Sequence, residues 1–366
     1  MRRGLTLVEL LVVIVILTMV TAATIPLMAP VTGQRKIRES ARLVAALLSQ
    51  AQSRAIASGR PVGVWMERLW TKDASDDRAN HAIDLFLCQS PPPFSGATPD
   101  ARAMISKSGS SWVVDMQMIP QGWVQRGDEI RFNYRGPTYR ILGVGPNVNN
   151  NPTHPDGSLT GANMEIVVPP PPYAQPPVAA QVPYQIFRQP VKTADEPVTL
   201  PAGAMVDLSF SGIGYGTQFG VATPGNPATK FAQQDPSAVT GVPNVQGVSK
   251  PVAIMFGPSG KLDCVYYAHR PATSSQPVYG RFEAITPVFL LVAPPTNAAS
   301  TAPPNYLNQD NIWVTVNAQS GLVTNGEVAL NTDAFVTFAN PTYDDFKKAI
   351  VASRAFARSQ QNMGGR

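Results

Sequence analysis

The first 58 residues show a hydrophobic pattern that changes halfway along. Between Leu10 and Met28 no residue is charged, and three threonines are the polar side chains. Beyond that run, apolar residues recur every three or four positions with charged residues between them: Ile37, Ala41, Val44, Leu48, Ala51 and Ala55. This period is that of a helix with one buried face. The pattern therefore predicts one helix of roughly 80 Å, apolar all round over residues 5–28 and one-sided over residues 29–59.

Prolines and glycines divide this helix. Pro26 and Pro30 lack the amide donor of a helical residue and should loosen the helix, and Gly33 marks a further weak point. The sequence Gly59-Arg60-Pro61 predicts its end. The apolar run is long enough to span a bilayer, which takes about 20 residues. We therefore expect the helix to start in lipid and to finish against a globular domain.

The pattern of apolar and turn-forming residues over 60–340 predicts short strands joined by turns and loops. The expected strands are residues 62–66, 82–88, 112–118, 128–134, 138–144, 164–168, 184–188, 205–210, 252–256, 262–267, 287–292 and 312–316. Segments rich in proline, asparagine and glycine at 146–156, 169–183 and 216–247 predict loops or insertions. The predicted fold class is α+β, a long N-terminal helix packed on an antiparallel β-sheet or sandwich that is enlarged by Pro-rich insertions.

In the final segment, residues 341–366, the sequence pattern predicts a basic amphipathic helix over 342–360. Thr342 can cap it, with two aspartates in the first turn. The expected apolar anchors are Phe346, Ile350 and Phe356, and the positive charges are Lys347, Lys348, Arg354 and Arg358. In one interpretation this helix packs on the domain and leaves a solvated charged face. In the other, the four cations contact DNA, an anionic envelope polymer or a partner subunit.

Composition suits a domain outside the cytosol. Hydrophobic residues make up 44% of the chain, enough for a core, whereas charged residues make up 14%, well below the usual share of about a quarter. The 36 prolines are roughly twice the average. Low charge and many prolines favour a loop-rich β domain over a helical cytosolic enzyme. The net charge of +5 does not by itself indicate nucleic acid.

The two cysteines, Cys88 and Cys264, each lie in an apolar alternating stretch. In an oxidising compartment they could form a disulfide, and two buried free thiols are the alternative. The histidines, at 81, 154 and 269, are scattered and lack metal-ligand spacing with the cysteines. We therefore expect no zinc site and no cofactor.

Catalytic motifs are weak. Residues 257–261 are similar to a phosphate-binding loop, but Met255 stands in place of the required first glycine and Leu262 in place of the Ser or Thr. A hairpin turn is the better interpretation there. Asp128 and Glu129 are adjacent, so on a strand they point to opposite faces and do not favour paired acid–base work. We expect a protein that is not an enzyme.

The sequence Arg2-Arg3-Gly4-Leu5-Thr6-Leu7-Val8-Glu9, followed by the apolar run, resembles the type III signal of type IV pilins and type II secretion pseudopilins. The resemblance implies that residues 1–4 are a leader. An inner-membrane prepilin peptidase would cut between Gly4 and Leu5, and Leu5 would then be N-methylated. Family members usually have Phe or Met after the cut, so Leu5 departs mildly. Pro26 falls where family members commonly carry a helix-loosening proline.

Glu9 is the fifth residue after that cut, where the family carries a glutamate. A carboxylate buried among packed apolar helices is tolerable only when it is paired or hydrogen-bonded. In the family its partner is the terminal amine of a neighbouring subunit, which here implies the amine of Leu5. Cleavage would thus create the cation that Glu9 needs, and the pair would set the register between subunits.

Three later blocks are similar to GspH/FimT-type pseudopilins. They are residues 42–48 and 52–59 with 62–64, residues 254–260, and residues 312–316 with 320–323. The family's domain is usually much shorter, so residues 73–125 and 146–183 are departures.

The resemblance implies a minor pseudopilin or pilin, a structural subunit of a type II secretion or type IV pilus-like filament. Its partners would be the prepilin peptidase and methyltransferase, other pilin or pseudopilin subunits, and the inner membrane. It would cross that membrane once, with its N-terminus cytoplasmic and its bulk periplasmic, before it enters a filament. One alternative is a minor pilin whose basic tail captures DNA during uptake. Another is an enzyme or receptor merely tethered by the helix.

Two other interpretations of the N-terminus compete with this one. A secretory signal peptide would use Arg2 and Arg3 as its basic region and residues 7–17 as its apolar core. Glu9 is unusual in such a core, and Thr21-Ala22-Ala23 is a poor cleavage site. A permanent signal anchor is the second, and charge bias alone does not fix orientation because basic residues flank both ends of the apolar run.

Overall fold

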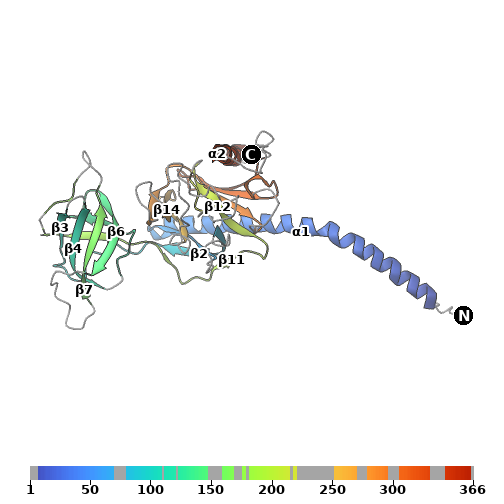
Figure 1. The fold of residues 1–366 in the computed structure, drawn as a ribbon, viewed down its shortest axis with the longest axis horizontal. Coiled ribbons are helices and arrows are strands. Elements are labelled where there is room, and N and C mark those ends of the chain that lie inside the picture. The colour runs from blue at the N-terminus through green and yellow to red at the C-terminus, as the bar shows by residue number, and fades with distance from the viewer. Residues whose placement is uncertain are drawn as a thin grey trace.

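The computed structural model describes residues 7–69, 80–108, 111–120, 123–146, 159–168, 175–178, 181–214, 217–220, 251–269, 278–295, 305–329 and 343–363. The side chains of Glu9 and of residues 22–32 are among those outside this description. The described residues form a long N-terminal helix, two antiparallel β-sheets and a C-terminal helix (Figure 1). The predicted α+β class is therefore confirmed.

Helix α1 runs from Leu7 to Ser58 without interruption. Its C-terminal half lies against the larger sheet, and its N-terminal half projects away from the rest of the molecule (Figure 1). The pause expected around Pro26, Pro30 and Gly33 is absent, because helical backbone continues through all three positions. Every position of the predicted apolar stripe is buried: Ile37, Ala41, Val44, Leu48, Ala51 and Ala55. Gly59, in a left-handed conformation, follows the last turn and ends the helix.

The larger sheet, called the main sheet below, has 11 strands, all paired antiparallel. Its path runs β15-β14-β13-β1-β2-β12-β16-β17-β18, with β10 and β11 also paired to β2. The strands are β1 (Val62–Arg68), β2 (His81–Gln89), β10 (Val191–Lys192), β11 (Val198–Thr199), β12 (Met205–Ile213), β13 (Val252–Phe256), β14 (Leu262–His269), β15 (Val278–Glu283), β16 (Val288–Ala293), β17 (Ile312–Val316) and β18 (Val323–Glu327).

The second sheet has seven strands in the order β8-β3-β4-β7-β6-β5-β9. They are β3 (Ala103–Ser108), β4 (Ser111–Pro120), β5 (Glu129–Phe132), β6 (Thr138–Pro146), β7 (Leu159–Val167), β8 (Gln181–Val182) and β9 (Tyr184–Phe187). The two edge strands, β8 and β9, are separated in the chain by Pro183 alone. One extended segment thus pairs with β3 on one side and β5 on the other. The sheet therefore closes into a small barrel, which removes its open edges.

Each layer has its own apolar core. The largest lies between α1 and the main sheet and contains Leu48, Val64 and Ile254. The barrel encloses a separate one around Ile105, Ile130 and Tyr184. On the far face of the main sheet, two smaller clusters lie under helix α2 (Tyr343–Met363) and over strands β13–β15. A short 3-10 helix, η2 (Asn305–Leu307), adjoins α2.

The twelve predicted strands all overlap observed ones, and residues 252–256 and 312–316 match strands β13 and β17 residue for residue. The predicted hairpin at 128–144 is β5 paired with β6. Most of residues 73–125 and all of residues 146–183, which depart from the shorter domain of the resembling family, lie between main-sheet strands β2 and β10 in the chain. Together with β5 and β6 they supply the barrel, whose closure depends on strand pairing between distant segments.

Candidate assembly site

The projecting half of α1 carries a long set of exposed apolar side chains. The large hydrophobic residues between Leu7 and Val20 are 48–80% exposed. Full burial of one such side chain stabilises by about 1.5–3 kcal/mol. Contiguous apolar surface of this extent marks a contact with a membrane or with other proteins. In this chain it surrounds the helix, so a complete partner layer is needed to cover it.

Two threonines within this half are satisfied by the helix itself. Thr18 donates its hydroxyl to the Val15 carbonyl at 2.9 Å, and Thr21 donates to the Leu17 carbonyl at 2.6 Å. Such bonds to the preceding turn allow a threonine to enter an apolar environment without an unpaired donor. The backbone of Glu9 is helical, but its side chain lies outside the described residues, as do Gly4 and Leu5 entirely.

Across the described part of the chain, no helix combines the length and hydropathy needed to cross a membrane. The membrane span over residues 5–28 stays a prediction.

Polar contacts fasten the second half of α1 to the domain. Gln34 donates to Asp310 at 2.7 Å, and Lys36 donates to the Ala202 carbonyl at 3.1 Å. Further along, the Gln52 amide donates to the carbonyls of Gly260 and Ser320, at 2.8 and 3.1 Å. With the buried stripe between them, these contacts hold the helix on the main sheet. The projecting half continues from this fastened half as uninterrupted helical backbone.

Helix α2 covers the other face of the main sheet. Ala349, Ile350 and Ala357 are buried against it, and Ser353 accepts a hydrogen bond from the Trp313 indole at 2.9 Å. Of the three predicted anchors, Ile350 is confirmed. Phe356 is 40% exposed, so that prediction was wrong. The Phe346 side chain and Thr342 lie outside the described residues.

Arg354 is the unexpected anchor of α2, because its side chain is fully buried. Its guanidinium donates to the carbonyls of Phe210, Gly214 and Thr217, at 2.6, 2.8 and 3.2 Å. Burial lowers the pKa of Arg354 to about 9, so the group stays charged at neutral pH. The predicted anion-contacting set is therefore corrected: Arg354 does not belong to it. Lys347, Lys348 and Arg358 remain exposed on α2.

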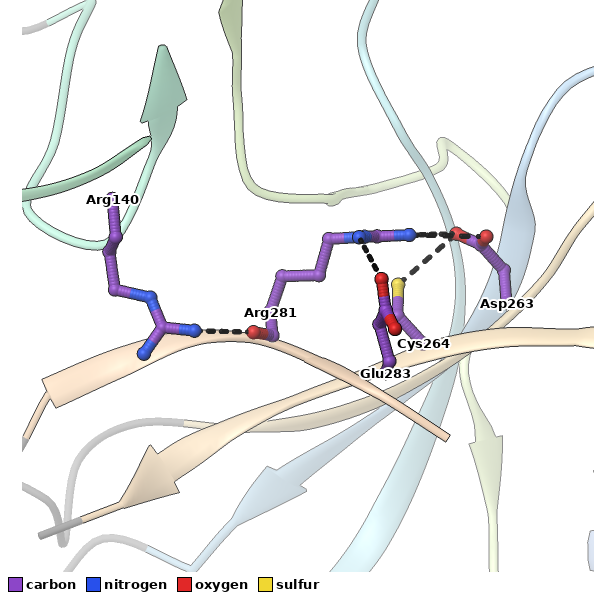
Figure 2. Close-up of polar contacts among 5 residues, drawn as sticks. All are labelled: Arg140, Asp263, Cys264, Arg281 and Glu283. Atoms are coloured by element: carbon purple, nitrogen blue, oxygen red, sulfur yellow. Dashed lines mark hydrogen bonds and ion pairs between the residues drawn. The ribbon is translucent and has the colours of Figure 1, made fainter. Parts of the chain in front are cut away.

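The barrel meets the main sheet at edge strand β15. Arg140 of β6 donates to the Arg281 carbonyl at 2.6 Å, and its guanidinium lies 4.8 Å from the Phe282 ring centroid. The Arg281 side chain turns the other way, toward Asp263 at 3.2 Å and Glu283 at 4.0 Å (Figure 2). A Cβ at Gly280 would lie 3.2 Å from Arg140, so glycine permits this close approach. The barrel thus covers an otherwise open edge of the main sheet.

A buried aspartate fixes the segment that leads from the barrel back to the main sheet. Asp128, before β5, accepts the backbone amides of Gln125 and Gln189, at 2.8 and 3.1 Å. Burial raises its pKa to about 6, although these amides and nearby Arg188 act in the opposite direction. The Gln189 amide side chain adds a bond to the Arg126 carbonyl at 2.8 Å.

The cysteines are both buried and both free. Strand pairing places Cys88, Gly63, Met255 and Cys264 in one row across four adjacent strands. Three strand spacings of about 4.8 Å separate the two cysteines by roughly 14 Å, too far for a disulfide. Cys88 instead contacts the Met255 sulfur at 3.5 Å, and Cys264 donates to Asp263 at 3.3 Å (Figure 2). Of the two alternatives, the disulfide was wrong. Burial raises the pKa of both thiols.

Comparison with known proteins gives one match. Residues 1–25 match the family model described as the prokaryotic N-terminal methylation motif, which is typical of type IV pilins and type II pseudopilins. No curated protein and no solved structure matches the chain. The motif implies processing by a prepilin peptidase and attachment to a membrane. The chain is thus a prepilin-like protein.

Proposed function

We propose that this prepilin-like chain is a minor pseudopilin or pilin, a structural subunit of a type II secretion or type IV pilus-like filament. The observation that carries the proposal is the exposed apolar half of α1, which continues without a break from the half that packs on the domain. The chain waits in the inner membrane, with its N-terminus cytoplasmic and its bulk periplasmic. After cleavage behind Gly4 and methylation of Leu5, the apolar half enters the filament core and the β domains face outward.

Glu9 gives the assembly its register. In a core of packed apolar helices, an unpaired carboxylate costs several kcal/mol, on the order of the penalty for breaking a buried ion pair. The new amine of Leu5 on a neighbouring subunit supplies the counter-charge. A subunit that inserts one turn out of place leaves both charges unpaired. Pro26, which offers no amide hydrogen to the helix, loosens the apolar half as it packs among its neighbours.

Within this class we assign the chain to the GspH/FimT-type pseudopilins. The three blocks that resemble that family meet at one place in the fold. Gln52, from the helical block, donates to the carbonyls of Gly260 and Ser320, from the other two. A Cβ at Gly321 would lie 2.0 Å from the Gly260 carbonyl oxygen, so glycine is needed where these two turns touch. Blocks that converge in space support a shared architecture better than sequence order alone.

Filament entry tests this function. The Glu9→Ala chain should be cleaved normally yet be incorporated into filaments at least about tenfold less, because a loss of ~1.4 kcal/mol already corresponds to that factor. Glu39→Ala is the matched control, since Glu39 is exposed on the packed half of the same helix. Incorporation is measured as the fraction of subunit in sheared filaments. Equal incorporation of both variants into filaments would contradict the pairing of Glu9 with the terminal amine of a neighbouring subunit. If a chain that cannot be cleaved behind Gly4 still functions in the cell, a tethered enzyme or receptor would be favoured instead.

A further inference from the structure

A cavity of about 570 Å³ lies where the barrel, the main sheet and their connecting segment meet. Its walls are largely aromatic and apolar, with Trp65 of β1, Tyr279 of β15 and Trp123 of the barrel among them. This volume and this position between two folded units are typical of small-molecule sites. The cavity is remote from α1's projecting half, so it is not explained by assembly through that half.

Two cations and one carboxylate line the cavity. Arg188 and Lys192 both line it. Asp128 also lines it; its carboxylate is buried, accepts two backbone amides and interacts electrostatically with Arg188. Among the described residues Arg188 has no carboxylate within ion-pair distance, and its Nε is a buried donor without an acceptor. Lys192 is partly neutralised, because it pairs with Glu67 at 2.5 Å.

The two cations are held in place by aromatic rings. The Arg188 guanidinium lies 4.7 Å from the Trp123 ring centroid, and the Lys192 ammonium lies 3.8 Å from that of Phe86. Such cation–π contacts orient a charge without neutralising it. The Asp128 and Gln189 contacts described above fix the backbone that carries Arg188. The site is therefore preformed, and its Arg188 guanidinium makes no ion pair among the described residues, which leaves it able to receive an anion.

We propose that this cavity binds an amphipathic carboxylate, that is, one anionic head attached to a flat apolar body. The head pairs with Arg188, for which a planar carboxylate is a bidentate partner. The body lies between the tryptophan and tyrosine walls. Either a free aromatic acid or the C-terminal residue of a peptide presents this chemistry. The inference is independent of the filament function and stands if assembly fails.

Calorimetric titration of the detergent-solubilised full chain tests the proposal with 2-naphthoate and its neutral analogue 2-naphthamide. Naphthoate should bind and the amide should bind at least about tenfold more weakly, since a hydrogen bond to a charged group contributes about 1.5–3 kcal/mol. A tripeptide ending in Phe, with a free or an amidated C-terminus, forms the second arm. Tight binding of the free-carboxylate peptide identifies a chain end as the source, and binding of naphthoate alone identifies a small acid.

Arg188→Met should weaken naphthoate binding by about tenfold or more. The matched control is Arg131→Met, because Arg131 has the same stacked geometry, 4.8 Å from the Phe187 ring, yet does not line the cavity. If Arg188→Met fails to fold, Lys192→Met provides a second test and should weaken binding by a smaller factor. The proposal is overturned if acid and amide bind alike, if Arg188→Met binds as Arg131→Met does, or if naphthoate fails to bind at millimolar concentration.

Discussion

The two halves of α1 differ in what they contact. From Ile37 to Ala55 the helix buries one stripe on the main sheet and exposes its charged residues. From Leu7 to Val20 it exposes large apolar side chains on all sides. One half thus obeys the rule for a surface helix of a globular domain, and the other half obeys the rule for a helix that is surrounded.

This difference shows that a single helix can belong to two structures. The packed half is complete within one chain, because its apolar stripe and its polar ties all find partners in the domain. The projecting half is complete only in the presence of lipid or of neighbouring helices. The helical backbone is continuous from one half to the other.

Leu48→Ala should have the largest effect on stability. Leu48 is fully buried between α1 and the main sheet, and such truncations cost about 3–5 kcal/mol through lost burial and the cavity left behind. Leu11→Ala, in the projecting half, should change the free energy of unfolding of the detergent-solubilised chain by less than about 0.5 kcal/mol. Urea unfolding measures both. Similar losses of unfolding free energy from the two truncations would contradict the division of α1 into a packed half and a projecting half.

Arg354→Met extends the comparison to the second helix. It removes the three hydrogen bonds that the guanidinium donates to backbone carbonyls, and we expect a loss of about 3 kcal/mol, since a hydrogen bond to a charged group contributes about 1.5–3 kcal/mol and removal of a buried charge returns part of the total. Lys347→Met, at an exposed position of α2, is the control and should be nearly neutral. Urea unfolding, followed by hydrogen exchange of α2, checks the result. An Arg354→Met chain as stable as the control would show that the buried guanidinium is dispensable.

A pH series separates the barrel junction from α1. The pKa of Asp128 is raised from 3.8 to about 6 in the folded chain, so the folded state binds this proton more tightly than the unfolded state does. Its contribution to stability is full below pH 3.8 and is lost as pH rises through about 6. At about 1.4 kcal/mol per pKa unit, the stability of the native chain relative to Asp128→Asn should fall by up to about 3 kcal/mol between pH 4 and pH 7.5. A relative stability that is flat over this range would contradict the shift.

Gln52→Ala tests the smallest of the four effects. It removes two hydrogen bonds from the packed half to the turns at Gly260 and Ser320, for a loss of about 1–2 kcal/mol. Ser53→Ala is the control, because within the described part of the chain the Ser53 hydroxyl bonds to its own helix, at the Ser49 carbonyl. Thermal unfolding in detergent compares the two variants. A Gln52→Ala chain that melts with the control would remove this contact from the account of how the three blocks are joined.

Local patterns in the sequence were enough to predict the buried stripe of α1 and the central strands. Those features depend on periods of three to four or of two residues, which neighbouring positions carry. The barrel was missed because Gln181–Phe187 closes it by pairing with strands at residues 103–104 and 129–132. The separation of Cys88 from Cys264 likewise depends on strand order. Arginine is rarely buried, so nothing local distinguished Arg354 from the exposed lysines of α2.

Among the predicted site residues, Gly4, Leu5 and Glu9 are specified by a local motif, and the match over residues 1–25 agrees with that motif. The lining of the junction cavity could not be predicted, because Trp65, Trp123 and Arg188 come from three separate segments of the chain. Such sites depend on the fold as a whole.

The central claim is that cleavage behind Gly4 creates the amine with which Glu9 pairs. Mass spectrometry of the N-terminal peptide, from protein isolated from its own cells, tests it most directly. The account predicts a chain that begins at Leu5 and carries one added methyl group on its terminal nitrogen. A chain that retains Met1, or one that begins near Ala23, would contradict it.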